Sequence, residues 1–331
     1  DCFYFSNRES PNIQWELMVR RHLRINPLFY YLDKVNQLIP GGEAHHKVAV
    51  CPGLMRDVKN YLCRTNPHIN FITEEDNKGR EFLEKLGMKA SDRFVCLLVR
   101  DSAYKKKFQN WKSDWSYHDY RNSDIETFKE AAMSLAEKGY WVFRMGKKVH
   151  KSLNENHHRI LDYANSQYRS DFLDIWLMAN CHFTISTGLG LDSVADIFRR
   201  PQLFVNYLPL MDMEAWGPYI TVPKNLTWFV SGRPLTLSEQ VQHTSVNGHY
   251  YREHGIAIKD LSPSDIKHAV MEMEAQLIGN WLWTKEDEEL NQRFWVGLRE
   301  FSEFARYHGW IHPEARLGTN YLRRSKEWLF T

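Results

Sequence analysis

The feature that most constrains this chain is a strand that runs through a glycine turn into a helix. Residues 183–185 are apolar and favour a strand, and the turn at 186–190 contains two glycines. From Leu191 apolar residues recur with helical spacing until a proline ends the pattern, and 202–206 favour another strand. Such a turn is typical of anion sites, because free backbone N–H groups and the positive end of the helix dipole meet there.

The turn matches neither of the two common nucleotide-binding signatures. It contains no GxGxxG fingerprint, and no Gly-Lys-Ser/Thr supplies the lysine that would hold a terminal phosphate. A strand, a glycine turn and a helix also occur together as a simple connection. The flanking sequence therefore has to decide between a site and a connection.

Strands and helices alternate on both sides of this turn. The run 94–99 is apolar throughout, as expected of a strand buried on both faces. Further strands are expected at 140–143, 183–185, 202–206 and 219–222, with a short one near 159–163, and helices at 124–138, 171–180, 191–198 and 262–278. This alternation predicts an α/β fold with a parallel sheet and helices on both faces.

The length of 331 residues allows two domains, and we place a boundary near 90–92. Residues 1–90 are expected to hold strands at 47–51 and 70–73 and helices at 56–64 and 74–86, and residues 281–331 are expected to be helical, including 284–307. The chain begins with Asp1 and lacks a first strand–loop–helix unit, so we expect the first domain to be incomplete.

Composition excludes several classes of function. A formal net charge of +2 gives no global attraction to nucleic acid or membrane. The five cysteines are scattered without a CxxC pair, which favours a reducing, cytoplasmic setting over a disulfide framework or a zinc site. The histidine pairs at 45–46 and 157–158 lack carboxylates at metal spacing, so we predict no metal. No run reaches the roughly 18 apolar residues of a membrane span.

Two surface features keep alternative interpretations open. Arg20, Arg21 and Arg24 make a basic helix face, interpreted as a solvated surface, with an anionic acceptor or a membrane surface as the alternative. The 12 Trp, 16 Tyr and 18 Phe are attributed mainly to packing, with stacking against sugar rings as the alternative.

Polar groups follow four of the expected strands. In an open parallel sheet the ligand crevice lies beyond the carboxyl ends of the strands, so these groups are expected to meet at one edge. They are Arg100 and Asp101; Arg144, Gly146, Lys147 and Lys148; Ser186, Thr187, Gly188 and Gly190; and Asn206 and Tyr207. Cations, hydroxyls and amides at one edge suit an anionic ligand that carries hydroxyls, such as a nucleotide sugar.

The segment between Arg100 and the helix at 124 is longer than the two to six residues common in such units. Its Lys105–Lys107 run is interpreted as a solvated loop tip. Ser123 or Asp124 is suited to cap the helix, whereas His118 and Arg121 have no capping role. Arg121 is expected to hold a diphosphate, and His118 to act as an acid or base or to bind a ligand hydroxyl.

Five segments resemble a family of bacterial glycosyltransferases found with surface-polysaccharide assembly. They are Val99–Tyr104, Tyr120–Ile125, Gly139–Gly146, Ser186–Gly188 with Leu191–Ala195, and Ile220–Lys224. The likeness covers most of the chain from about 90 to 280. It implies the GT-B fold, two Rossmann-like domains facing a cleft, with an acceptor-side domain at 1–90, a nucleotide-sugar domain at 91–280 and C-terminal helices at 281–331 that pack back across both.

With that resemblance, the leading hypothesis is metal-independent and cofactor-free transfer of a sugar from a nucleotide sugar to a surface glycan or lipid-linked glycan. The catalytic candidates are Asp101 and His118. The donor-binding candidates are Arg100, Arg121, Asn122, Arg144, Gly146, Lys147, Ser186, Thr187, Gly188, Gly190, Asp192 and Ser193. Peripheral contact with the cytoplasmic membrane face belongs to the same expectation.

Two other functions are weighed against it. A non-catalytic glycan- or nucleotide-binding protein on the same fold would explain the aromatic content and the incomplete first domain. A dehydrogenase or nucleotide-sugar epimerase is disfavoured, because GxGxxG is absent and no acidic residue follows a first strand at the required spacing.

Overall fold

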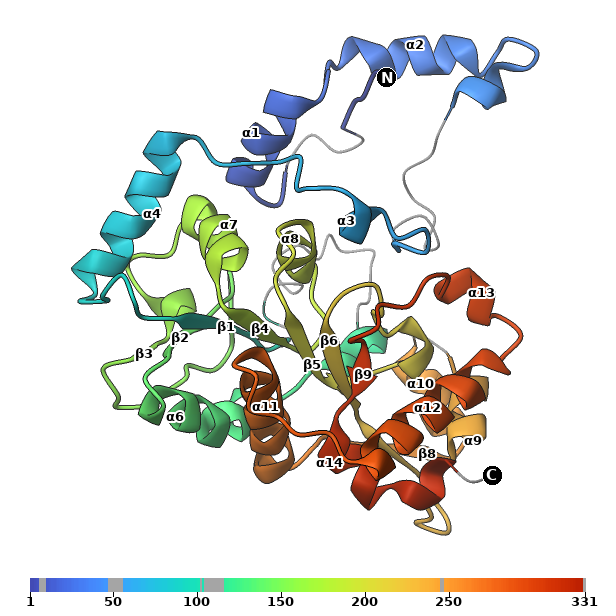
Figure 1. Ribbon diagram of the computed structural model, residues 1–331. Helices are drawn as coiled ribbons and strands as arrows, with labels where there is room; N and C mark the ends of the chain where they lie inside the picture. Colours follow the sequence, from blue (N-terminus) through green and yellow to red (C-terminus); the bar gives the residue numbers. More distant parts are fainter. Residues whose placement is uncertain (6–9, 47–55, 102, 104–115, 245–246, 330–331) are drawn as a thin grey trace.

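The computed structural model describes residues 1–331 except 6–9, 47–55, 102, 104–115, 245–246 and 330–331. Its centre is a seven-stranded sheet in which all neighbouring strands are parallel (Figure 1). The order is β3-β2-β1-β4-β5-β6-β9. The strands are β1 (Phe94–Leu98), β2 (Trp141–Arg144), β3 (Ile160–Leu161), β4 (Phe183–Ser186), β5 (Gln202–Tyr207), β6 (Tyr219–Pro223) and β9 (Arg316–Leu317). The expected α/β class and parallel sheet are confirmed.

Side chains of the central strand alternate between two hydrophobic layers, because successive residues of a strand point to opposite faces. Val95 and Leu97 join a core with α6 (Lys129–Glu137) and α11 (Pro263–Leu277). Cys96 and Leu98 join a second core with α7 (Asp171–Asn180) and α8 (Asp192–Ile197). Figure 1 shows α6 and α11 on one side of the sheet and α7 and α8 on the other.

The N-terminal region packs on the α7 face of the sheet. Its helices are α1 (Ile13–His22), α2 (Leu28–Asn36), α3 (Tyr61–Arg64) and α4 (Thr73–Lys85), with a 3-10 turn η1 (Gly42–His45). Met18 of α1 and Phe82 of α4 are buried in the same core as α7. In Figure 1 α1, α2 and α3 lie at the top of the molecule and α4 at its left side, and α2 extends away from the sheet.

The expected strands of residues 1–90 are not found among the described residues there. The strand predicted at 70–73 is wrong, because Ile72 caps α4 and its N–H donates to the Glu75 carboxylate at 3.0 Å. The helix predicted at 56–64 reduces to α3. The strand predicted at 47–51 lies outside the described residues. In the described part of this region only an isolated bridge, Phe3 to Ile25, has strand-like pairing, so a first Rossmann-like domain remains a prediction.

The C-terminal residues complete the main sheet. Beyond α12 (Lys285–Arg299) and α13 (Phe304–Tyr307), the unpredicted strand β9 pairs with β6, and α14 (Thr319–Arg324) and η7 (Lys326–Leu329) follow. The helix expected at 284–307 ends at Arg299. Residues 281–331 therefore supply a strand as well as helices.

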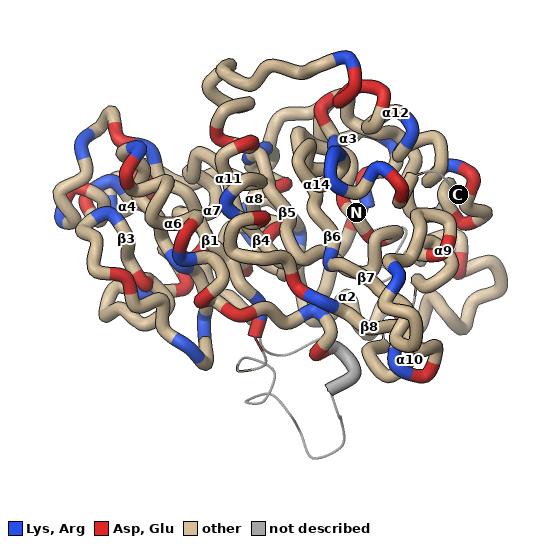
Figure 2. The backbone as a smooth tube through the Cα atoms, turned by 90° about the horizontal axis from the view of Figure 1, so that it is seen from below, with Lys and Arg blue, Asp and Glu red and all other residues tan. Residues whose placement is uncertain are grey.

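A small antiparallel hairpin lies beside the main sheet. It consists of β7 (Asn225–Trp228) and β8 (Ile256–Lys259), with α9 (Leu237–Gln242) and α10 (Gly248–Glu253) between them in the chain. No described helix has the length and apolar character to cross a membrane. Figure 2 shows positive and negative residues intermixed along the described backbone, in keeping with the net charge of +2.

Candidate functional site

The strand order places a switch point between β1 and β4. From β1 the chain continues through β2 and β3 to one side of the sheet, and from β4 through β5 and β6 to the other. Ligands of such sheets bind outside the carboxyl ends of the strands at this point. Leu98, at the end of β1, is in register with Ser186, at the end of β4, so the segments that follow both strands start side by side.

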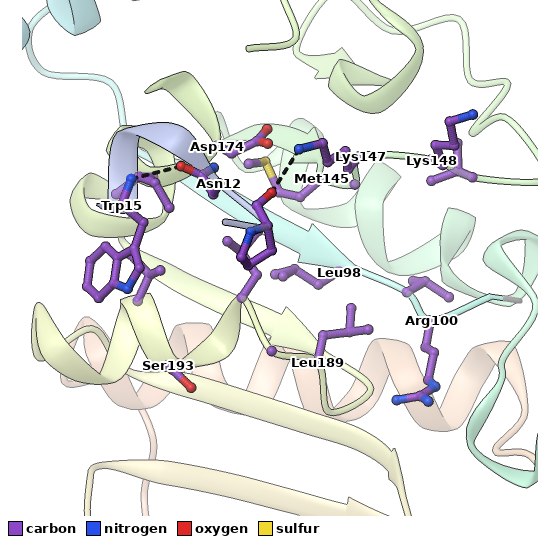
Figure 3. Close-up of a pocket in the computed structure, with 18 of the residues that line it drawn as sticks. Asn12, Trp15, Leu98, Arg100, Met145, Lys147, Lys148, Asp174, Leu189 and Ser193 are labelled. Carbon is purple, nitrogen blue, oxygen red and sulfur yellow. Dashed lines mark hydrogen bonds between the residues drawn. The ribbon is translucent and has the colours of Figure 1, made fainter. Parts of the chain in front are cut away.

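A cavity of about 410 Å³ lies at this switch point (Figure 3). Its walls come from the ends of β1 and β2, the turn after β4, the start of α8, part of α7 and the start of α1. The predicted residues Arg100, Asp101, Gly146, Lys147, Gly190 and Ser193 all line it. The structure therefore brings together five of the twelve predicted donor-binding residues and one of the two catalytic candidates.

The turn after β4 is organised by Asp192. Its Oδ2 accepts hydrogen bonds from the Ser186 hydroxyl at 2.8 Å and the Leu189 N–H at 2.5 Å. The Ser186 hydroxyl also accepts from the Gly188 N–H at 3.1 Å. Ser186 and Asp192 are fully buried, so they shape the turn from beneath. This differs from the expectation of direct donor contact by both residues.

Gly188 allows Arg121 to approach the turn. Its φ is +80°, a left-handed conformation that side chains disfavour, and a Cβ there would lie 3.1 Å from Arg121 Nη2 and 3.3 Å from Tyr207 Cε2. Arg121 Nη2 donates to the Gly188 carbonyl at 3.0 Å. The Thr187 hydroxyl accepts from the Arg100 N–H at 2.9 Å, which joins the β1 and β4 turns.

Burial shifts the pKa values of Asp192 in this turn and of Arg100 beside it. It raises the pKa of Asp192 to about 7, against the hydrogen bonds from Leu189 and Ser186. Burial and the nearby Arg121 lower the pKa of Arg100 to about 10. Arg100 still carries its charge at neutral pH, and its guanidinium has no hydrogen-bond or ion-pair partner among the described residues.

Further unpartnered donors face the same cavity. Within the described part of the chain, no acceptor is found for the backbone N–H groups of Gly190 and Leu191. Lys148 also lines the cavity without an ion pair in that part of the chain, but Figure 3 shows its side chain directed away from Arg100. Arg100 and the two N–H groups can bind an anion without breaking an existing interaction. The α8 dipole contributes little, because Asp192 already sits at the start of that six-residue helix.

A second cavity of about 340 Å³ adjoins the first and shares Val99 and Asp101 with it. Its lining includes the polar side chains of Asn122, Ser123, Asp124, Arg144, His150, Lys151 and Asp260. Such carboxylate, amide and hydroxyl groups are suited to hydrogen-bond a ligand rich in hydroxyls. The two cavities lie next to each other at Asp101 and together make up the candidate site.

Asp101 is held firmly between the cavities. Its Oδ1 accepts from the Ala103 N–H and its Oδ2 from the His150 N–H, each at 2.8 Å. Arg144, only 1% exposed, places Nη2 3.9 Å from Asp101 Oδ2 and Nη1 3.4 Å from Asp162 Oδ1. Arg144 thus links two carboxylates, as a structural ion pair does. Its role as a direct donor contact stays a prediction.

The loop that carries Asn122 is fixed by contacts that the sequence did not suggest. Lys224 follows β6, and its Nζ donates to the Asn122 carbonyl and to Asp260 Oδ1, both at 2.7 Å. Asn206 donates to the Ser123 hydroxyl at 3.1 Å. Asp162, Lys224 and Asp260 are the residues that sequence reasoning missed. Of these three residues, only Lys224 could have been found from the sequence, because it follows an expected strand and belongs to a segment that resembles the glycosyltransferase family.

Two other predicted residues are Lys147 and His118. Lys147 reaches back to the N-terminal segment, where its Nζ donates to the Pro11 carbonyl at 2.8 Å and lies 3.3 Å from Asp171 (Figure 3). His118 belongs to the turn η3 (Ser116–Arg121), and its side chain lies outside the described residues. The described residues contain no group of three or more His, Cys, Asp or Glu side chains placed to hold a metal.

Comparisons with known proteins add little to this geometry. No protein-family model matches the chain, and no curated protein matches it. A solved structure, the glycosyl transferase family 9 protein from Veillonella parvula, aligns with a TM-score of 0.34 and 14% identity. The alignment spans 47% of this chain and 42% of that chain, and a likeness of this size carries no argument about function.

Proposed function

We propose that the chain is a glycosyltransferase that takes its sugar from a nucleotide-sugar donor. The observation that carries the proposal is the pair of neighbouring cavities at the switch point, one with unpartnered cations and N–H groups and one lined by hydroxyl-binding side chains. The first is suited to a nucleoside diphosphate and the second to a sugar. A GT-B arrangement and a surface-glycan or lipid-linked acceptor at the cytoplasmic membrane face belong to this proposal.

In the proposed reaction an acceptor hydroxyl oxygen attacks the anomeric carbon of the donor. The bond from that carbon to the phosphate oxygen breaks, and the nucleoside diphosphate leaves with the electron pair. Arg100 and the N–H groups of Gly190 and Leu191 would stabilise the charge that develops on the diphosphate. The hydroxyl proton passes to a base, for which Asp101 and His118 remain the candidates.

A second function is favoured by the surroundings of Asp101. Both of its carboxylate oxygens already accept backbone hydrogen bonds, and Arg144 lies beside it. The carboxylate of Asp101 is therefore engaged in holding the backbone around it. The alternative is therefore a nucleotide- or glycan-binding protein that binds in the same cavities and performs no transfer.

Calorimetric titration with UDP, GDP, CDP and dTDP tests the binding part of the proposal. Arg100→Ala is expected to weaken binding of the nucleotide by roughly ten- to a hundredfold, since a charge-assisted hydrogen bond contributes about 1.5–3 kcal/mol. Gly188→Val should weaken it as well, because Arg121 and Tyr207 would have to shift. The matched control is Arg299→Ala, an exposed arginine at the end of α12.

Unchanged affinity in Arg100→Ala and Gly188→Val would refute the assignment of the site. Activity is measured separately, as release of nucleoside diphosphate from the sugar donor that binds, with and without glycan acceptors. Turnover excludes the non-catalytic alternative. Binding without turnover for every donor and acceptor favours it.

A further inference from the structure

Helix α2 carries an apolar stripe that faces solvent. None of its nine residues is buried, and none belongs to the hydrophobic cores formed by the described residues. In Figure 1 the helix extends away from the sheet. Apolar residues at i, i+3, i+4 and i+7, continued by two after the helix, fall on one side of it. This α2 stripe, whose side chains are 55–84% exposed, consists of Leu28, Tyr31, Leu32, Val35, Leu38 and Ile39.

The other side of α2 is polar and is held by the surrounding chain. The Tyr4 hydroxyl donates to Asp33 Oδ2 at 2.8 Å, and His46 Nδ1 contacts Asp33 Oδ1. Asn36 Nδ2 donates to the Gly42 carbonyl at 2.7 Å. A helix packed on a core turns its apolar side inward and its polar side to water. Helix α2 does the reverse, so its apolar stripe is available to a partner.

The charges along α2 favour an anionic partner. Between residues 24 and 40 the charged residues are Arg24, Asp33 and Lys34. Asp33 is held inward, whereas Arg24 and Lys34 are exposed and have no ion pair among the described residues. Arg20 and Arg21, which share the predicted basic face with Arg24, are paired with glutamates. The exposed charges of this segment are therefore two free cations.

The size of the stripe favours a lipid bilayer over a second copy of the chain. Stable protein interfaces bury about 800 Å² on each partner and use roughly 20–30 residues a side. The α2 stripe offers six side chains on a helix about 14 Å long. A bilayer needs no matching surface, because apolar side chains of a helix in the interface plane enter the acyl boundary while cations stay among anionic headgroups.

We propose that the α2 stripe binds the surface of a bilayer that contains anionic lipids, with α2 lying in the plane of the interface. This gives the membrane contact of the proposed function a specific surface, and the binding itself does not depend on sugar transfer. Helix α1 joins that surface to the candidate site, because Pro11, Asn12 and Trp15 line the larger cavity and α2 follows α1 in the chain. Docking would hold the site close to a lipid-linked acceptor.

The first test uses the unaltered protein and measures its co-sedimentation with vesicles. One set contains phosphatidylcholine alone, and the other contains equal amounts of phosphatidylcholine and phosphatidylglycerol. The protein should bind the anionic vesicles at least about tenfold more tightly, since each cation near an anionic surface contributes roughly fivefold. Salt should reduce this preference, because it screens exposed charges.

The second test changes the stripe itself. Leu32→Asp with Val35→Asp should weaken vesicle binding by at least about tenfold, because the two new carboxylates face the bilayer in place of apolar side chains. The matched control is Leu282→Asp with Val296→Asp, the same replacements at side chains that are 87% and 49% exposed outside α2. It adds the same charge and should leave vesicle binding unchanged.

The third test changes the two free cations. Arg24→Gln with Lys34→Gln should weaken binding to the anionic vesicles by roughly fivefold for each charge removed and leave the weak binding to neutral vesicles unchanged. Equal binding of the unaltered protein to both sets of vesicles would overturn the anionic preference.

The remaining outcomes concern the surface. Vesicle binding that Leu32→Asp with Val35→Asp does not weaken, or that the control weakens equally, would overturn the role of α2. A dimer in analytical ultracentrifugation that the same double variant dissociates would assign the stripe to a second copy and overturn the proposal. Absence of binding to either set of vesicles would also overturn it. Nucleotide binding by the unaltered protein is measured without lipid, so failure here is distinct from failure of the proposed function.

Discussion

The buried carboxyl of Asp192 gives the most quantitative prediction. The side chain is 1% exposed, and its Oδ2 accepts the bonds from Ser186 and Leu189 that hold the β4 turn. Its Oδ1 has no partner among the described residues. In Asp192→Asn the amide oxygen can accept both bonds, and the neutral amide group occupies the place of Oδ1. The variant should fold and lose only the titration.

The size of the effect follows from the pKa, which burial raises from 3.8 to about 7. Since the folded state binds this proton more tightly than the unfolded state, the contribution to stability is present below about pH 4 and is lost as pH rises through 7. At about 1.4 kcal/mol per pH unit, the loss is about 1.5 kcal/mol at pH 5 and about 4 kcal/mol at pH 8. Asp196 adds to the upward shift and Arg121 opposes it.

Urea unfolding at about pH 5 and pH 8 measures the effect. The free energy of unfolding of Asp192→Asn minus that of the unaltered protein should increase by about 2.5 kcal/mol between the two pH values. Taking this difference cancels the titration of groups that do not interact with Asp192. Asp196 and Glu214 do interact with it, so Asp192→Asn also relieves their repulsion at pH 8 and increases the difference in the same direction. Glu137→Gln, at an exposed side chain, is the control and should show no such increase.

A difference that stays constant with pH would refute this account of Asp192. The same variant bears on the site. A neutral group beneath the turn does not repel a phosphate, so Asp192→Asn should bind nucleotide at least as tightly as the unaltered protein at pH 8. Much weaker binding would show that the charge of Asp192 is needed.

Two further predictions concern packing around the site. Gly79→Ala in α4 should lower the free energy of unfolding by about 1–3 kcal/mol, because the new Cβ would lie 2.1 Å from Cε2 of the buried Trp176. Helix propensity alone predicts the opposite, so a variant more stable than the unaltered protein would contradict this account. Lys224→Met should destabilise the protein by somewhat less than the roughly 3–5 kcal/mol of a fully buried broken pair, because the Asp260 side chain is 33% exposed. The double variant Lys224→Met with Asp260→Asn should lose less free energy of unfolding than the sum of the losses in the two single variants. If urea unfolding shows that the losses simply add, the two side chains do not stabilise each other.

The local sequence was sufficient to predict the central strands of the sheet. The apolar run at 94–99 and the shorter runs that became β2, β4 and β5 are too apolar for anything but buried strands. The rule that ligands bind at the carboxyl ends of such strands then placed Arg100 and Gly190 at the same cavity. Both inferences depend only on residues close together in the chain.

The rest depends on contacts between distant residues or on competition between local signals. At 70–73 the β-forming Phe71 and Ile72 favoured a strand, but the Glu75 carboxylate caps a helix there. The two residues of β9 carry no periodicity at all. The pairing of Lys224 with Asp260, and the wall that Trp15 makes, join residues from different elements, so no local pattern indicates them.

A crystal structure of the protein with a bound nucleoside diphosphate tests the central claim most directly. We predict that the diphosphate lies in the cavity at the ends of β1 and β4, within hydrogen-bond distance of Arg100 and of the N–H groups of Gly190 and Leu191. A nucleotide bound elsewhere on the molecule, with this cavity empty, would contradict the account.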